Sequence, residues 1–368
     1  MFRRWRWWVV SAGVAALIAT PGLVSRLPAG SPALAPAALL ARVQSARTTP
    51  YAGYAEVTGG LSLPVAGDLA SLTELLGGRT ELRAWWRSAS SWRVDAIDVV
   101  GERGVYRQGE HVWSWDYQDN RATRSHAGDP DSIRLPVAAD TLPSLLGWRL
   151  LGDARAAEVT GLPSRRVAGR AADGLRLVPT QPYASVGRVD LWVDRASAVP
   201  LLVELVARGA SAPSISTTFL DFEPRLPGLD ETQFRAPEGA RVRSASTFDL
   251  ARLATRIPAT APPDRLIGLT RGRRLAEAGS VGVYGQGVTQ LALSPMPRRL
   301  AASLRDQLAR TPGAQRTGAG EALSVGALSL LLTTADRAGR AWLLSGTVTV
   351  SGLVTAAAEL LADQAADR

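Results

Sequence analysis

The sequence predicts an α+β protein in which a long antiparallel β region precedes a smaller unit of strands and helices. Short apolar runs bounded by turn residues occupy most of residues 51–222, which is typical of strands joined by hairpins. Helical spacing of apolar residues is confined to a few short stretches. The chain has 368 residues, of which 46% are hydrophobic, so it is long and apolar enough for two separate cores.

The N-terminus carries the pattern of a segment that enters a membrane. Arg3, Arg4 and Arg6 precede residues 7–25, which carry no charge. A helix of that length would span roughly 28 Å, close to the thickness of a hydrocarbon core. We therefore expect residues 1–26 to be a signal peptide or an uncleaved signal anchor, and both alternatives remain open. A linker over 27–36 would follow, with the rest of the chain extracytoplasmic and any anchor in the cytoplasmic membrane.

The first domain is expected over residues 37–247. A helix at 37–46 leads into a strand at 51–57, and a short helix is expected at 69–76. The alternating pattern then predicts a meander with strands at 80–87, 92–99, 105–107, 111–117 and 121–123. A second block of strands is expected from 164 to 222, with members at 189–193, 200–207 and 214–222, and a final strand at 234–242.

A proline-rich linker over 248–264 separates a second domain, expected over 265–368. Its predicted strands lie at 281–284, 288–293, 328–333 and 341–348, and its predicted helices lie at 298–310 and 351–363. Leu300, Leu304 and Leu308 form one apolar stripe on the first of these helices. The pattern favours a small α/β unit at the C-terminus.

Composition excludes whole classes of chemistry. The chain has no cysteine and only two histidines, which excludes disulfides, thiolate metal sites and three-histidine metal centres. It also has no lysine, so it lacks the lysine of a phosphate-binding loop and Schiff-base chemistry. The arginines that give the net charge of +9 are scattered in sequence, which argues against a nucleic-acid partner. We expect no cofactor and no enzymatic activity.

Five of the eleven tryptophans lie between residues 80 and 125. Alternation along a strand places Trp113 and Trp115 on the same face as His111, which predicts a packed rather than a catalytic histidine. Trp85 and Trp86, being adjacent, must lie on opposite faces. The strand carboxylates near arginine are expected to form salt bridges at the rim of the sheet: Asp95, Asp98 and Asp116.

Three segments resemble a known family. Residues 226–242, Leu-Pro-Gly-Leu-Asp-Glu-Thr-Gln-Phe-Arg-Ala-Pro-Glu-Gly-Ala-Arg-Val, resemble the final strand of LolA-like lipoprotein carriers. The hairpin over 191–205 is similar to a strand–turn–strand unit of that superfamily. Residues 342–360 resemble the last strand and helix of the second domain in RseB/MucB-type sigma-factor regulatory proteins. The resemblance implies a half-open, strongly curved antiparallel β-barrel whose concavity is plugged by helices.

That resemblance implies non-catalytic binding of lipid or lipoprotein acyl chains in an apolar cavity, as a carrier or a lipid sensor. The candidate cavity residues are Trp86, Trp92, Trp113, Trp115 and Trp192; the alternative is that these side chains only fill a core. A second function remains open, that of an envelope-stress regulatory protein. Its partner would be the extracytoplasmic part of an anti-sigma factor or another single-pass membrane protein.

Overall fold

The computed structural model describes residues 34–59, 78–97, 101–127, 137–245, 262–272, 281–335 and 341–366. The predicted N-terminal segment over 1–26, the short helix at 69–76 and most of the 248–264 linker lie outside these ranges. No helix within them is long and apolar enough to cross a membrane.

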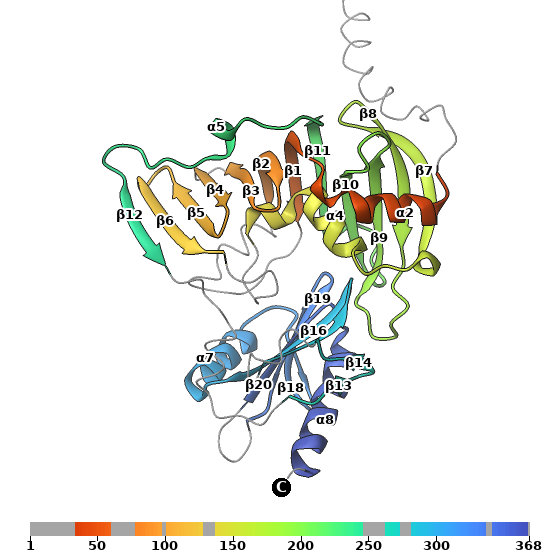
Figure 1. Ribbon diagram of the computed structural model, residues 1–368. Helices are drawn as coiled ribbons and strands as arrows, with labels where there is room; N and C mark the ends of the chain where they lie inside the picture. Colours follow the sequence, from red (N-terminus) through yellow and green to blue (C-terminus); the bar gives the residue numbers. More distant parts are fainter. Residues whose placement is uncertain are drawn as a thin grey trace, which may run out of the picture.

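Twelve strands form one large sheet that curves into an open arch (Figure 1). Its order is β12, β6, β5, β4, β3, β2, β1, β11, β10, β9, β8, β7, so that β12 and β7 are free edges. Neighbours are antiparallel, except that β12 runs parallel to β6. The strands are β1 Tyr51–Gly59, β2 Arg79–Ser88, β3 Ser91–Ile97, β4 Glu102–Gln108, β5 His111–Asp116, β6 Arg121–His126, β7 Val159–Val167, β8 Arg170–Leu177, β9 Val186–Asp194, β10 Pro200–Ala207, β11 Ile215–Glu223 and β12 Arg241–Ala245.

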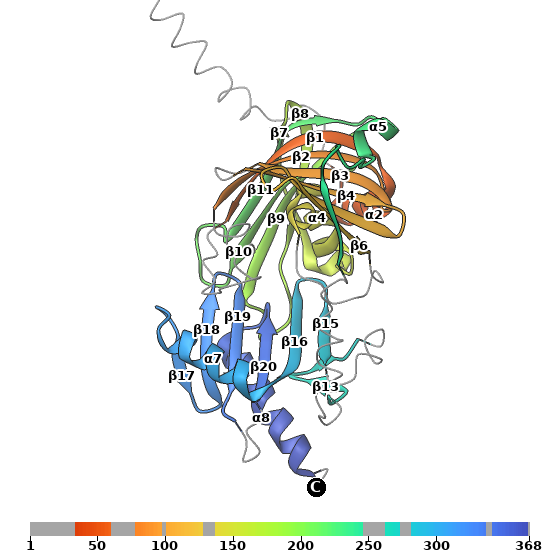
Figure 2. The same cartoon turned by 90° about the vertical axis from the view of Figure 1, so that its left-hand side faces the viewer.

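Two helices, α2 (Pro36–Ser45) and α4 (Pro143–Leu151), lie in the concavity of the arch (Figures 1 and 2). Both have proline in the first turn, where no backbone N–H is needed. Gly147 allows α4 to approach the sheet closely, because a Cβ atom there would lie 2.7 Å from Pro200. The short 3-10 turns η1 (Ala46–Thr48), η3 (Ala138–Thr141) and η4 (Ala156–Glu158) flank these helices.

The predicted meander is confirmed by β2 to β6, although β4 and β6 are longer than expected. The predicted final strand at 234–242 is wrong. Residues Leu229–Thr232 form the short helix α5 on the convex side of the arch, and β12 begins only at Arg241. Proline and glycine within this stretch interrupt ladder pairing, so the chain crosses the sheet before it joins the edge.

The second unit contains a six-stranded antiparallel sheet in the order β15, β16, β20, β19, β18, β17, together with two helices. Its elements are β15 Gly282–Gln286, β16 Thr289–Met296, α7 Arg298–Ala309, β17 Gln315–Thr317, β18 Gly320–Val325, β19 Leu328–Thr333, β20 Ala341–Gly346 and α8 Val350–Ala366, with the β13 (Arg265–Leu266) and β14 (Leu269–Thr270) hairpin beside them. The predicted fold class is confirmed: an open, helix-plugged sheet plus a smaller mixed unit.

Backbone contacts join the two units. Ala184 forms a β-bridge with Val348, and the Thr349 N–H donates to the Tyr183 carbonyl at 2.8 Å. The Ser185 hydroxyl donates to the Ala327 carbonyl, and Ala327 packs into the core of the large sheet. The two sheets lie within the predicted domains, 37–247 and 265–368, whose limits stay predictions.

Candidate functional site

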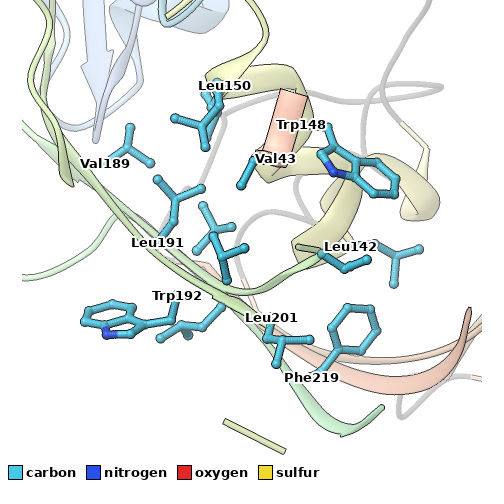
Figure 3. Close-up of a cluster of buried hydrophobic side chains, with 14 of the residues drawn as sticks. Val43, Leu142, Trp148, Leu150, Val189, Leu191, Trp192, Leu201 and Phe219 are labelled. Atoms are coloured by element: carbon cyan, nitrogen blue, oxygen red, sulfur yellow. The ribbon is translucent and has the colours of Figure 1, made fainter. Parts of the chain in front are cut away.

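The strand register divides the five candidate tryptophans between the two faces of the large sheet. Directly opposed residues on neighbouring antiparallel strands share a face. Trp86 lies opposite Trp92, and both belong to the core beneath the arch. The same alternation places Trp113, Trp115 and Trp192 on the convex face. Figure 3 shows Trp192 on the other side of the strands from the core leucines. The five tryptophans therefore do not form one site.

On the concave face, Trp86 is the centre of an aromatic stack. Its ring is stacked between Tyr51 of β1, at 6.3 Å, and Trp92 of β3, at 6.0 Å. Trp148 of α4 completes the cluster, with its ring centroid 6.2 Å from that of Trp86 (Figure 3 shows Trp148 on its helix). Each of these four side chains is more than nine-tenths buried.

The cluster contains two polar atoms without partners. The indole N–H groups of Trp86 and Trp148 are buried, and neither has a hydrogen-bond acceptor among the described residues. A buried N–H without an acceptor costs about 1–3 kcal/mol. Two such donors on adjacent rings, one from the sheet and one from the plugging helix, mark a place that could receive an acceptor from outside.

Side chains hold α4 in the concavity. The fully buried Tyr51 hydroxyl forms a hydrogen bond with Ser144 of α4, and burial raises the pKa of this tyrosine. The Gln44 side-chain amide donates to the carbonyl of Leu151, the last residue of α4, at 2.9 Å, and to that of Ala154, beyond the helix, at 3.2 Å. These contacts satisfy carbonyl groups that a helix end leaves without partners. The plug is therefore α4 tied to α2 by a few polar contacts.

The concave face is less covered over β4 to β6. Val112, Ser114 and Thr123 point to this side, and Ser114 is exposed while the other two are half-buried. Figure 1 shows α2 beside β7 and β8, α4 beside β10 and β11, and no described helix beneath β5 and β6. Within the described part of the chain, burial on the concave face therefore increases from the exposed Ser114 to the buried tryptophan cluster.

The convex face holds a second aromatic cluster. Residues 224–240, here named the strap, cross this face, and Phe234 of the strap packs within 5.1 Å of Tyr106 and Trp113 and within 5.7 Å of Trp115. A pocket of about 260 Å³ opens between strap and sheet. Its lining includes Tyr106, Trp115, Tyr117, Asp230, Gln233 and Phe234.

Salt bridges and packing explain most of the remaining candidates. The indole N–H of Trp192 donates to the Pro163 carbonyl at 3.1 Å, and the Arg165 guanidinium lies 3.8 Å from its ring, so its contacts are structural. Asp95 pairs with Arg93 as predicted, but it is buried within the sheet and not at its rim. Asp116 pairs with Arg103 and Arg121, whereas Asp98 lies outside the described residues.

The expectation for His111 is wrong. The side chain is exposed instead of packed, because it begins β5 and lies outside the cluster in which Phe234 packs on Trp113 and Trp115. Among the described residues, no group of three or more histidine, cysteine or acidic side chains could hold a metal ion.

Sequence reasoning missed two central side chains, Trp148 and Phe234. Trp148 lies in Pro-Ser-Leu-Leu-Gly-Trp-Arg-Leu-Leu, where a proline followed by a run of apolar residues could have indicated a short buried helix. Phe234 was assigned to a strand, although it stands only two residues after α5. Neither position carries a motif that separates a functional from a structural role.

Comparison with known proteins gives a likeness of fold. No family model and no curated protein sequence matches the chain. A crystal structure of MucB in complex with MucA(peri) is 17% identical with a TM-score of 0.47, and the match covers 87% of this chain and 96% of that one. The Pseudomonas aeruginosa MucA/MucB complex is 16% identical with a TM-score of 0.47, over 87% and 96%.

A LolA superfamily protein from Nitrosomonas europaea is 12% identical with a TM-score of 0.24, and its match covers 55% of this chain and 99% of that one. MucB and a LolA superfamily protein, which represent the two groups that the sequence resembles, are thus among the similar solved structures.

Proposed function

We propose that the protein is an extracytoplasmic, non-catalytic binder that holds an acyl chain of a lipid or lipoprotein against the concave face of the large sheet. The observation that carries this proposal is the pair of buried indole N–H groups of Trp86 and Trp148 with no acceptor in the described chain. An ester or amide carbonyl at the head of an acyl chain supplies such an acceptor. Each indole N–H that gains one recovers part of its cost of about 1–3 kcal/mol.

Apolar contact would supply most of the affinity. Each methylene group removed from water contributes about 0.8 kcal/mol before ordering costs. Val112 and Val105 provide half-buried apolar surface on β5 and β4, and Trp92 and Trp86 continue it on the same face. An acyl chain entering over β4 and β5 would displace α4 from part of its contact with Trp86, so the helix acts as a movable plug.

Native mass spectrometry with lipid extraction tests the proposal on the full-length chain. We expect a stoichiometric lipid or acylated peptide in the wild-type protein and a reduced amount in the Trp148→Phe variant. Trp113→Phe makes the same chemical change on the convex face and should retain the ligand. A protein that is purified empty and takes up no lipid from added phospholipid vesicles would contradict the proposal.

A second candidate function is capture of a partner protein, such as the extracytoplasmic part of an anti-sigma factor. The convex pocket favours it, because aromatic side chains beside Asp230 and Gln233 offer both apolar and hydrogen-bonding contacts to an extended peptide. Phe234→Ala should then abolish binding of the anti-sigma segment and leave lipid content unchanged. Binding that survives Phe234→Ala would exclude the pocket as the docking site.

A further inference from the structure

The large sheet buries one polar side chain at a distance from the two indoles. Thr217 of β11 is 0% exposed, and its hydroxyl has no hydrogen-bond partner among the described residues. It lies between two apolar neighbours, opposite Val57 of β1 and opposite Val203 of β10. A buried hydroxyl without a partner carries a desolvation cost, part of which an oxygen atom of a ligand would recover.

The strand register places Thr217 on the same concave face as Trp86. Trp86 lies opposite Tyr51, and Val57 follows Tyr51 by six residues on β1 (51 to 57). An even separation keeps two side chains of one strand on one face, and directly opposed residues share that face. Thr217, opposite Val57, therefore faces the interior of the arch. Six residues of strand separate it from the level of Trp86 by about 20 Å.

The concave face between these two levels is apolar. Leu82 and Ala84 of β2 and Ala55 of β1 lie there, and each is at least 99% buried. At the far level, Thr80 of β2 lies opposite Val57 and is also buried, so a threonine stands on either side of that valine. Hydrogen-bonding groups thus mark both ends of a stretch that is otherwise apolar.

We propose that the acyl chain bound on this face carries a second oxygen, as a hydroxyl or carbonyl group, that forms a hydrogen bond with Thr217. The inference rests on the proposed function, in which Trp86 and Trp148 hold the acyl carbonyl. A threonine hydroxyl donates and accepts, so it can pair with either group. A chain of single bonds extends by about 1.2 Å per bond, so roughly 16 bonds lie between the two oxygens.

The arrangement selects a chain by the position of its second polar group. A hydroxyl near the far end of the chain reaches Thr217 and satisfies it. A hydroxyl beside the acyl carbonyl remains about 20 Å away, at the level of the indoles. An unsubstituted chain leaves Thr217 without a partner, as it is in the ligand-free protein.

Competition between methyl 16-hydroxyhexadecanoate and methyl hexadecanoate, measured by native mass spectrometry of the full-length chain, tests this inference. The wild-type protein should prefer the hydroxylated ester about three- to tenfold, the effect of one net hydrogen bond. Methyl 2-hydroxyhexadecanoate should show no such preference. Thr217→Val should abolish the preference, because the hydroxyl of the ligand would then be buried unpaired, and Thr217→Ser should retain it.

Thr289→Val is the matched control. The Thr289 hydroxyl is likewise buried without a partner among the described residues, but it belongs to β16 in the second unit. This variant should keep the wild-type preference. Both valine variants remove an unpaired buried hydroxyl, so thermal unfolding should show them at least as stable as wild type. A lost preference in Thr217→Val is then not a loss of structure.

The outcomes separate this inference from the function on which it rests. Equal uptake of the 16-hydroxy and unsubstituted esters by the wild-type protein would overturn the role of Thr217 and leave acyl binding intact. A preference that survives in Thr217→Val would do the same, because the hydroxyl would be bound elsewhere. Uptake of neither ester would contradict the proposed function itself, and this inference with it.

Discussion

The indole rings of Trp86 and Trp148 lie 6.2 Å apart, one on the second strand of the arch and the other on the helix that plugs it. Both N–H groups are buried and have no acceptor within the described chain. A protein that only needed to fill this space could have used phenylalanine or leucine without leaving polar atoms unsatisfied. The proposed ligand site rests on the relationship between these two residues.

The stability of tryptophan variants should distinguish a buried indole N–H without an acceptor from one that is hydrogen-bonded. In lipid-free protein, Trp86→Phe removes an unsatisfied N–H, which offsets the loss of ring atoms, so the free energy of unfolding should change by less than about 1 kcal/mol. Trp192→Phe removes the hydrogen bond to Pro163 and should cost about 2–3 kcal/mol. Urea unfolding measures both. An equal loss in the two variants would show that the Trp86 N–H is satisfied.

Loosening the plug should speed ligand entry. Gln44→Ala removes the amide that donates to carbonyls at and beyond the C-terminal end of α4, at a cost of about 1 kcal/mol in stability. The association rate of a fluorescent fatty acid, measured by stopped flow, should increase. Arg42→Ala is the matched control, because its guanidinium donates to the carbonyls of Arg195 and Ala196 instead of α4. Equal rates in both variants would mean that ligands do not enter past α4.

The hydrogen bond between Arg225 and Glu231 in the strap should contribute less to the stability of the protein at acidic pH. The hydrogen bond from Arg225 lowers the pKa of Glu231 from its ordinary 4.5 to about 2, and the Gly228 N–H contributes to the same shift. Because the folded pKa is depressed, this contribution to stability is present above pH 4.5 and is lost as the pH falls towards 2. The difference in unfolding free energy between wild type and Glu231→Gln should therefore shrink over that range. A difference in unfolding free energy that does not change with pH would contradict this dependence on Glu231.

Adding one methyl group at the contact between the two units should destabilise the protein. A Cβ atom on Gly352 of α8 would lie 2.7 Å from the Tyr183 side chain and from Val348. Gly352→Ala should therefore destabilise the protein by about 1–3 kcal/mol, although alanine favours helices. Gly318→Ala meets no atom within 4 Å and should be close to neutral. Calorimetry measures the stability of both variants. A Gly352→Ala variant that is more stable than wild type would show that the neighbouring side chains move aside at little cost.

The sequence predicted which segments form strands better than it predicted which face of the sheet is concave. Alternation placed Trp113 with Trp115 and separated Trp85 from Trp86, because side-chain direction along a strand is a local property. Which face becomes concave depends on where the helices dock. That was decided by α4, whose nine residues are too short for a clear helical period.

The candidate site was also predictable only in part, because some of its contacts join segments that lie far apart in the sequence. Trp86 and Trp92 meet through neighbouring strands, which a meander implies. Trp148 comes from a helix much further along the chain, which the close contact of Gly147 with Pro200 holds against the sheet. The packing of Phe234 on the convex tryptophans likewise depends on a chain path that proline and glycine direct away from the ladder. Long-range packing of this kind leaves no periodic trace in sequence.

The central claim is that an acyl carbonyl binds the two buried indoles, and nuclear magnetic resonance of ¹⁵N-tryptophan-labelled protein tests it most directly. On adding a saturating lipid, the indole N–H signals of Trp86 and Trp148 should move downfield as they gain an acceptor, while those of Trp113 and Trp192 stay in place. Assignment uses the single Trp→Phe variants. Binding of lipid with no movement of the Trp86 and Trp148 signals, or movement only of the convex ones, would contradict the account.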